Sequence, residues 1–220
     1  MNALIGSGIV GQSLASSMHF DHIFNRNNIA DLVKFQFDHL VIAAPSGNRL
    51  RINNGDSTDT KDVDTILSTV KLAQPNRVTL ISSVDAITAP NSVYGKNRLW
   101  LENNLQATLP TGVLRLSTLI GKHIQKNVLY DIKHSQYLKE IDAAAWLQWC
   151  LLDDLQILVN DTKPGASIDV VSEPIQTQEI LTRFVPELQF NSRKTSLWYN
   201  QQPYLYNKQQ IFSAMDQYMS

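Results

Sequence analysis

MNALIGSGIVGQSLASSM, residues 1–18, is the stretch that decides the fold, because it holds Gly6, Gly8 and Gly11 at the spacing G-x-G-x-x-G. The apolar run at 3–5 directly before the glycines predicts a buried strand. Apolar residues then recur at helical spacing up to Met18, with small residues between them, which predicts a helix. Strand, glycine turn and helix in this order indicate a dinucleotide-binding site. A glycine-rich turn that binds no ligand is the alternative.

Each glycine has its own purpose in such a site. Gly6 allows a tight turn, Gly8 lets a pyrophosphate approach bare backbone, and Gly11 lets the helix pack closely on the strand. The N-terminus of the helix adds free N–H groups and a partial positive charge. We therefore predict that the whole turn binds the cofactor: Gly6, Ser7, Gly8, Ile9, Val10 and Gly11.

The composition describes a soluble globular protein. The chain has 220 residues, of which 43% are hydrophobic and 18% charged. We expect one Rossmann domain over 1–220, in which residues 121–220 contribute a small substrate lobe and a tail. The formal net charge of -1 gives no electrostatic footprint for nucleic acid or an anionic membrane.

The cysteine content and the start of the chain favour the cytoplasm. Cys150 is the only cysteine, so no intramolecular disulfide can form, and its apolar neighbours predict a buried side chain. No apolar stretch approaches the ~20 residues that span a bilayer, and the first strand leaves no room for a targeting peptide. The acidic residues at 56, 59, 62 and 64 lack the spacing of a calcium loop. We expect a helix cap near Asp59, a solvated helix face and no metal.

Strands alternate with helices along the chain. We expect strands at 22–25, 39–44, 77–81, 112–116 and 166–171, and helices from about 59, from Tyr94, at 143–152 and at 177–184. This alternation predicts an α/β fold with a Rossmann-like, doubly wound parallel sheet. The aromatic and amide-rich tail at 196–220 would either cover a substrate pocket or form a subunit interface, and the sequence leaves both open.

Ligands of an open parallel sheet collect at the carboxyl ends of the strands. Tyr94 begins the helix after one of these strands and can reach the same edge. The residues that follow the expected strands are cofactor-site candidates: Asn25, Arg26, Ala43, Ala44, Pro45, Ser82, Ser83, Leu116 and Ser117.

SVYGKNRLWLENNL, residues 92–105, resembles the catalytic helix of short-chain dehydrogenases/reductases of the extended, sugar-nucleotide-modifying type. In that family a Tyr is followed four residues later by a Lys, and commonly by a Glu four residues further on. This chain has Tyr94, Arg98 and Glu102. The resemblance continues through most of residues 1–185 in the order of the family. Its further segments are RVTLISS (77–83), GVLRLSTLIG (112–121), YLKEIDAAAWLQWCLL (137–152) and IDVVSEPIQTQEILTRF (168–184).

The resemblance implies an NAD(P)-dependent oxidoreductase, or an epimerase/dehydratase-like enzyme, acting on a nucleotide sugar or a related small alcohol or carbonyl compound. In the family the Tyr is the acid/base, the Ser hydrogen-bonds the reacting oxygen, and the Lys holds the ribose and lowers the pKa of the Tyr. Tyr94 fits the first role and Ser83 the second, with Ser82 a poorer fit. Arg98 stands in place of the Lys, which makes it the third catalytic candidate; it keeps the positive charge but is planar and bulkier. The resemblance also makes Tyr94 and Arg98 candidates for binding the cofactor.

Other interpretations stay open at this point. Val84 stands where extended members often have a third Ser or Thr, and Tyr94 could be an aromatic residue packed on the sheet. A non-catalytic NAD(P)-binding sensor or complex subunit that has lost the Lys is the first alternative. A Rossmann protein of another family is the second. The resemblance also suggests a homodimer.

The choice of cofactor depends on the end of the second strand. A carboxylate there accepts a hydrogen bond from the ribose 2′-hydroxyl of NAD, whereas an Arg suits the 2′-phosphate of NADP. HIFNRNN, residues 22–28, offers Arg26 and no acidic residue. We therefore predict NADP in preference to NAD, with a solvated loop charge as the alternative for Arg26.

Overall fold

The computed structural model describes residues 1–45, 47–188 and 203–220. The chain forms two compact units. The first comprises Met1–Arg115 and Asp153–Asp169, and the second comprises Leu116–Leu152 and Val170–Ser220. Residues 203–220 of the predicted tail are described, whereas its residues 196–202 lie outside the described part.

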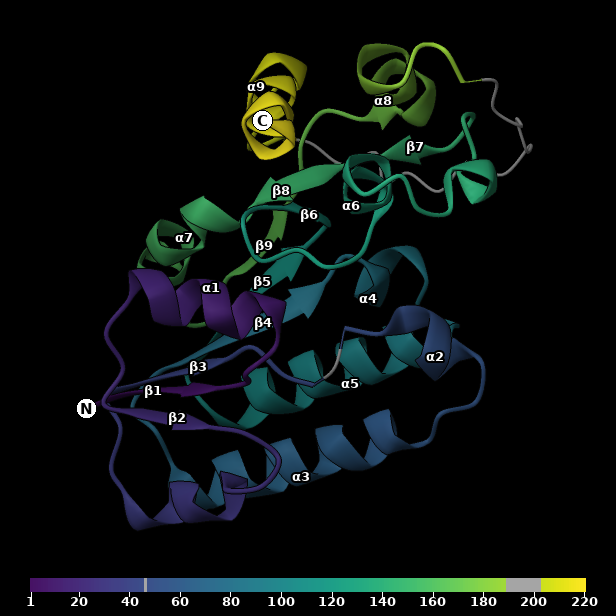
Figure 1. Ribbon diagram of the computed structural model, residues 1–220. Coiled ribbons are helices and arrows are strands. Elements are labelled where there is room, and N and C mark those ends of the chain that lie inside the picture. Colours follow the sequence, from purple (N-terminus) through teal and green to yellow (C-terminus); the bar gives the residue numbers. More distant parts are fainter. Residues whose placement is uncertain (46, 189–202) are drawn as a thin grey trace. The chain divides into compact units, whose positions relative to one another are not determined.

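A six-stranded sheet with the order β2-β1-β3-β4-β5-β9 forms the centre of the first unit (Figure 1). β1 runs parallel to β2 and β3, and β3 runs parallel to β4. The central strands are buried on both faces, as their unbroken apolar sequences predict. The strands are β1 (Asn2–Ile5), β2 (His22–Phe24), β3 (His39–Ile42), β4 (Val78–Ser83), β5 (Thr111–Leu116) and β9 (Ser167–Val170).

Helices cover both faces of this sheet. α1 (Ile9–Ser17) and α7 (Leu155–Asp161) lie on one face, and α3 (Thr58–Ala73) and α5 (Val93–Thr108) lie on the other (Figure 1). The predicted Rossmann-like α/β fold is therefore confirmed. The core under α3 and α5 contains Val63, Ile66, Val70, Leu101 and Leu105.

Short segments complete the first unit. The 3-10 helix η1 (Ile29–Lys34) connects β2 to β3. β2 stands first in the strand order and is therefore an edge strand of the sheet. The loop expected after β3 contains the short helix α2 (Arg49–Asn53), and α4 (Asp85–Thr88) separates β4 from α5.

Two small sheets form the second unit. β6 (Thr118–Ile120) runs parallel to β8 (Trp149–Leu151), and β7 (Trp146–Leu147) is antiparallel to β10 (Ile175–Gln176). The predicted helix at 143–152 is wrong, because this apolar run forms β7 and β8 and then begins the 3-10 turn η3 (Leu152–Asp154). Cys150 lies in β8 and is fully buried, as predicted.

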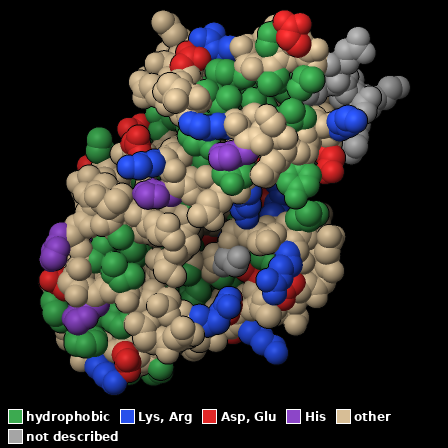
Figure 2. All heavy atoms as spheres, viewed as in Figure 1, with side chains coloured by type: hydrophobic (Ala, Val, Ile, Leu, Met, Phe, Trp, Pro, Cys, Tyr) green, Lys and Arg blue, Asp and Glu red, His purple; other side chains and the backbone are tan. Residues whose placement is uncertain are grey.

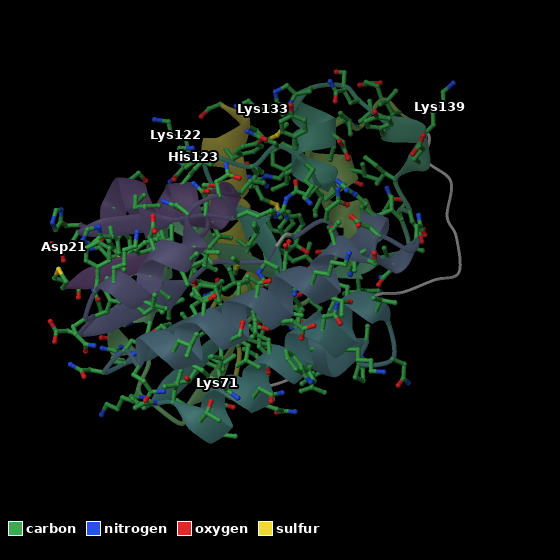
Figure 3. All side chains as sticks on the ribbon, turned by 90° about the horizontal axis from the view of Figure 1, so that it is seen from below. Asp21, Lys71, Lys122, His123, Lys133 and Lys139 are labelled. Atoms are coloured by element: carbon green, nitrogen blue, oxygen red, sulfur yellow. The ribbon has the colours of Figure 1, made fainter. Side chains whose placement is uncertain are left out.

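The helices of the second unit are α6 (Val128–Lys133), η2 (Leu138–Glu140), α8 (Thr177–Phe184) and α9 (Lys208–Met219). α8 has the bounds that its sequence predicts. Lys133 lies beside α9 (Figure 3), where its ammonium group donates to the carbonyl of Tyr218 and lies 4.9 Å from the centre of the Tyr218 ring. The end of the tail is thereby held against α6.

The surface carries both signs of charge. Basic and acidic side chains are interspersed over the face seen in Figure 2, as expected for a net charge of -1. Within the residues that the structure describes, no helix has the length and apolar character to cross a membrane.

Candidate functional site

The first glycine turn is held between two strands. The N–H group of Gly6 donates to the carbonyl oxygen of Phe24 at 2.8 Å, and Ala43 N–H donates to Ile5 O at 2.7 Å. Gly6 has a φ of +123°, and a Cβ atom at this position would lie 2.3 Å from the carbonyl oxygen of Ala43. Both the conformation and the space therefore require glycine, and the turn lies directly beside the end of β3.

Gly11 and Gly8 have opposite surroundings. A Cβ atom on Gly11 would lie 2.1 Å from the carbonyl oxygen of Gly6, whereas a Cβ atom on Gly8 would meet nothing within 4 Å. Gly8 is the N-cap residue of α1, and it supplies no side-chain cap to the first N–H groups of the helix. The side chain of Gln12 donates to the carbonyl of Ser7 at 3.0 Å and steadies the loop.

These features fit the diphosphate of a dinucleotide. Open space borders the bare backbone at Gly8, and uncapped N–H groups with a partial positive charge begin α1 at Ile9 and Val10. The two remaining glycines are needed for packing. The residues present are those that would hold the phosphates, and their role as ligands stays a prediction.

Asn25 and Arg26 follow β2 in a turn. The side chain of Asn25 accepts from the N–H of Asn27 at 2.9 Å. Arg26 is 72% exposed and pairs with Asp62 of α3 at 2.6 Å, and the hydrogen bond to Asp62 raises the pKa of the guanidinium. The loop position expected for Arg26 is therefore present, and its guanidinium is ion-paired.

A cavity of about 110 Å³ lies next to Arg26. A second cation, Arg51 of α2, also lines this cavity and pairs with Asp56 at 2.6 Å. The cavity is lined by Arg26, Asn48, Arg51, Ile52, Asp56, Thr58 and Asp59.

The two serines that end β4 differ in environment. Ser82 is buried, and its hydroxyl donates to Glu102 at 2.5 Å. Ser83 is half-buried, and its oxygen accepts from the N–H of Asp85 at 3.3 Å. Because an accepting hydroxyl keeps its own proton to donate, Ser83 is the serine that can hydrogen-bond a substrate oxygen.

The start of α5 is fixed by caps on both sides. The Ser92 hydroxyl accepts from the N–H of Gly95 at 3.0 Å, and the amide oxygen of Asn53 accepts from the N–H of Tyr94 at 3.0 Å. A Cβ atom on Gly95 would lie 2.2 Å from the carbonyl oxygen of Ala89. These contacts hold Tyr94 close to the segment that follows β4.

Arg98 lies one helical turn after Tyr94 and contacts its ring. The guanidinium carbon of Arg98 is 4.4 Å from the centre of the Tyr94 ring. Arg98 is 4% exposed and forms a 2.6 Å ion pair with Asp59, which is 1% exposed. The helix start predicted near Asp59 is confirmed, since α3 begins at Thr58 with Ser57 as its N-cap. The prediction of a solvated face is wrong for Asp59, because its carboxylate is buried against Arg98.

Glu102, one helical turn after Arg98 on α5, is the centre of a second ion-pair network. The carboxylate of Glu102 accepts from Ser82 and also from Nη2 of Arg115 at 2.7 Å. Arg115 in turn donates to Asp169 of β9 at 3.2 Å. The network joins α5 to β4, β5 and β9, and the sequence gives no local signal that Arg115 and Asp169 belong to it.

The remaining predicted residues lie at other strand ends. Ala44 and Pro45 follow Ala43 at half-buried positions. Leu116 and Ser117 belong to the second unit, where the hydroxyl of Ser117 donates to the carbonyl of Val170 at 2.8 Å. Their contribution to a cofactor site stays a prediction.

Solved structures of similar fold are numerous. A dTDP-glucose 4,6-dehydratase from Streptomyces venezuelae, solved with NAD bound, is 16% identical, with a TM-score of 0.69 over 89% of this chain and 84% of the other. A UDP-glucose 4-epimerase from Thermotoga maritima, solved with UDP-glucose, is 14% identical, with a TM-score of 0.68 over 88% of this chain and 87% of the other.

The chain has the fold of these epimerases and dehydratases. Pal from Bacillus thuringiensis shares this similarity at 13% identity, with a TM-score of 0.73 over 91% of this chain and 90% of the other. The resemblance to the epimerase/dehydratase type of short-chain dehydrogenase/reductase is therefore confirmed at the level of the fold. No protein-family model matches the chain, and no curated protein matches its sequence.

Proposed function

We propose that the protein is an NADP-dependent oxidoreductase or epimerase/dehydratase-like enzyme acting on a nucleotide sugar or a related small alcohol or carbonyl compound. The observation that carries this proposal is the open space at Gly8, in a turn where Gly6 and Gly11 leave no room for a side chain. The similar structures support the choice of ligands, since they were solved with UDP-glucose or with NAD.

A nicotinamide cofactor would supply the hydride chemistry when bound. Tyr94 would move the proton to or from the substrate oxygen, and Ser83 would hydrogen-bond that oxygen. An unperturbed tyrosine has a pKa of about 10 and is a poor base at neutral pH. The Arg98 guanidinium, whose carbon lies 4.4 Å from the centre of the Tyr94 ring, would place a positive charge beside this side chain.

The preference for NADP rests on Arg26. Its place after β2 suits a ribose 2′-phosphate, and Arg51 supplies a second cation in the adjoining cavity. A phosphate would compete with Asp62 and Asp56 for these guanidinium groups. We expect NADPH to bind more tightly than NADH.

The cofactor proposal is tested by titrating the protein with NADPH and with NADH while nicotinamide fluorescence is recorded. The variant Arg26→Gln should weaken NADPH binding at least tenfold and leave NADH binding within twofold. Arg183→Gln is the matched control, because Arg183 is likewise an exposed arginine that pairs with an aspartate, Asp216, at 2.6 Å. Equal losses of affinity for NADPH and NADH would show that Arg26 does not contact the 2′-phosphate. The proposal of a nicotinamide-binding site would still stand.

The proposal also includes the wider setting of the enzyme. Residues 121–220 would provide a small substrate lobe, and the enzyme would work as a cytoplasmic homodimer without nucleic-acid or membrane partners. Size-exclusion chromatography with light scattering measures the oligomeric state directly.

A second candidate is a non-catalytic NAD(P)-binding sensor or complex subunit. It is favoured by the pairing of Arg98 with Asp59 and by Val84 at the position where extended members often have a Ser or Thr. A panel of UDP- and dTDP-sugars with NADP or NAD separates the two. Turnover that is lost in Tyr94→Phe supports the enzyme, whereas cofactor binding without turnover of any sugar supports the sensor.

A further inference from the structure

Asp59 is a buried carboxylate at the start of α3 that receives two donors from α5. Its Oδ1 atom accepts from Arg98 at 2.6 Å, and its Oδ2 atom accepts from the side-chain amide of Asn97 at 2.8 Å. Only 1% of the residue is exposed. A buried carboxylate requires such partners, because an unpaired charge in this environment is strongly destabilising. Asp59 therefore joins α3 firmly to the helix that carries Tyr94.

The guanidinium of Arg98 makes contacts of different kinds with Asp59 and with Tyr94. Its edge is bonded to Asp59, and its face lies 4.4 Å from the centre of the Tyr94 ring. Arg98 is 4% exposed, so little of the side chain is open to a ligand. If the guanidinium moved towards a bound ribose, the carboxylate of Asp59 would lose its strongest partner while still buried.

We propose that Asp59 is a positioning residue that holds the Arg98 guanidinium against the Tyr94 ring and keeps it away from the ribose of a bound cofactor. This inference rests on the proposed function and deepens it. The family resemblance gives the corresponding lysine two roles, and in this chain Arg98 performs only the one towards the phenol. Because Asp59 offsets part of the charge of Arg98, removing either partner of the ion pair changes the electrostatic field at the Tyr94 ring.

The other charges on α5 and on the elements packed against it are either paired or open to solvent. Asp62 of α3 pairs with Arg26, whereas Lys96 of α5 and Lys61 and Asp64 of α3 are exposed and Lys71 of α3 is half-buried. β4 carries no charged residue. On α5 itself, Glu102 is bonded to Arg115. The pairs contributed by α2, α4 and the loop before α3 are Arg49 with Asp85 at 3.1 Å and Arg51 with Asp56 at 2.6 Å. Asp59 is thus the charge whose removal changes the field at Tyr94 through a direct contact with Arg98.

The test measures the ionisation of Tyr94 in the cofactor-free protein. Tyrosines labelled with ¹³C at Cζ are followed by NMR across alkaline pH, and Tyr94→Phe identifies the resonance. Asp59→Asn leaves the Arg98 cation without its anion and should lower the pKa of Tyr94 by about one pH unit or more. Arg98→Gln should raise it above the wild-type value. Asp64→Asn, an exposed position on the same helix, is the matched control and should leave it unchanged.

A variant that neutralises both partners covers the case in which Asp59→Asn does not fold. Asp59→Asn/Arg98→Gln removes both charges and nearly keeps their volumes, and it should raise the pKa of Tyr94 above the wild-type value. The same pKa in the wild type and in the folded variants would overturn the positioning role.

Cofactor binding tests the second half of the proposal. Arg98→Gln should keep its dissociation constant for NADPH within about twofold of the wild-type value, and a tenfold loss would show that Arg98 reaches the ribose. If the wild-type protein binds no nicotinamide cofactor, the proposed function fails, whereas the order of Tyr94 pKa values still decides whether Asp59 positions Arg98.

Discussion

The two glycines Gly8 and Gly11 should respond in opposite ways to the same added methyl group. Gly8 has φ -78° and ψ -169°, which any residue adopts, and a Cβ atom there meets nothing within 4 Å. Gly8→Ala should therefore leave the free energy of unfolding unchanged or raise it by ~0.4–1 kcal/mol, since alanine has less conformational freedom than glycine in the unfolded chain. In Gly11→Ala the methyl group would lie 2.1 Å from the carbonyl oxygen of Gly6.

The magnitude for Gly11→Ala follows from that contact. Ordinary van der Waals contact begins near 3.4 Å, so β1 and α1 must move apart by about an ångström, because the obstructing atom belongs to the backbone. Overpacking of this kind costs ~1–3 kcal/mol or more, and the better helix propensity of alanine offsets about 1 kcal/mol. We expect a net loss of up to ~2 kcal/mol. Urea unfolding followed by circular dichroism measures both variants, and equal midpoints would refute the close packing of the turn.

Two further predictions concern buried ionisable groups. Glu102→Gln should lower the free energy of unfolding by ~3 kcal/mol, since Arg115 is 15% exposed and loses its closest anion; a loss below 1 kcal/mol in urea unfolding would contradict this role of the network. Burial lowers the pKa of His39 from 6.5 to about 4, so the unfolded chain takes up a proton on this residue at a higher pH than the folded chain does. The stabilisation that comes from neutral His39 is therefore complete above pH 6.5, and the free energy of unfolding falls by ~3 kcal/mol as the pH falls to about 4. His39→Gln should flatten this part of the curve of stability against pH. An unchanged slope in the variant, measured by urea unfolding at several pH values, would contradict the burial of a neutral imidazole.

The parts of the fold that the sequence predicts are those with local signals. The glycine turn, the apolar strands of the central sheet and the amphipathic helix α8 are each recognisable within about ten consecutive residues. The family resemblance around Tyr94 also predicts the order in which the strands and helices follow one another along the chain. The apolar runs of the central strands are short and end at glycine, proline or serine residues, which favours strands buried on both faces of a parallel sheet.

The apolar run at 143–152 shows where local signals end. It has no polar spacing to distinguish a helix from strands, and β7 and β8 form because β10 and β6 are available to pair with them. Such partners are decided by the tertiary structure.

Asp59 is the corresponding case in the candidate site. In the sequence it belongs to an acidic cluster at the start of a helix, which is typical of capping and solvation. Its actual partner, Arg98, is 39 residues away along the chain. Only the packing of α3 against α5 makes it a buried counter-charge, and the same holds for Arg115 and Asp169 with Glu102.

The most direct test of the central claim, that the opening glycine turn binds the diphosphate of a nicotinamide dinucleotide, is the dissociation constant of NADPH for the wild-type protein and for Gly8→Ala. We predict that the wild-type protein enhances NADPH fluorescence on binding. Gly8→Ala should fold with wild-type stability and bind at least tenfold more weakly, because its methyl group occupies the open space beside the turn. Equal affinity in the two proteins, or no binding by the wild type, would contradict it.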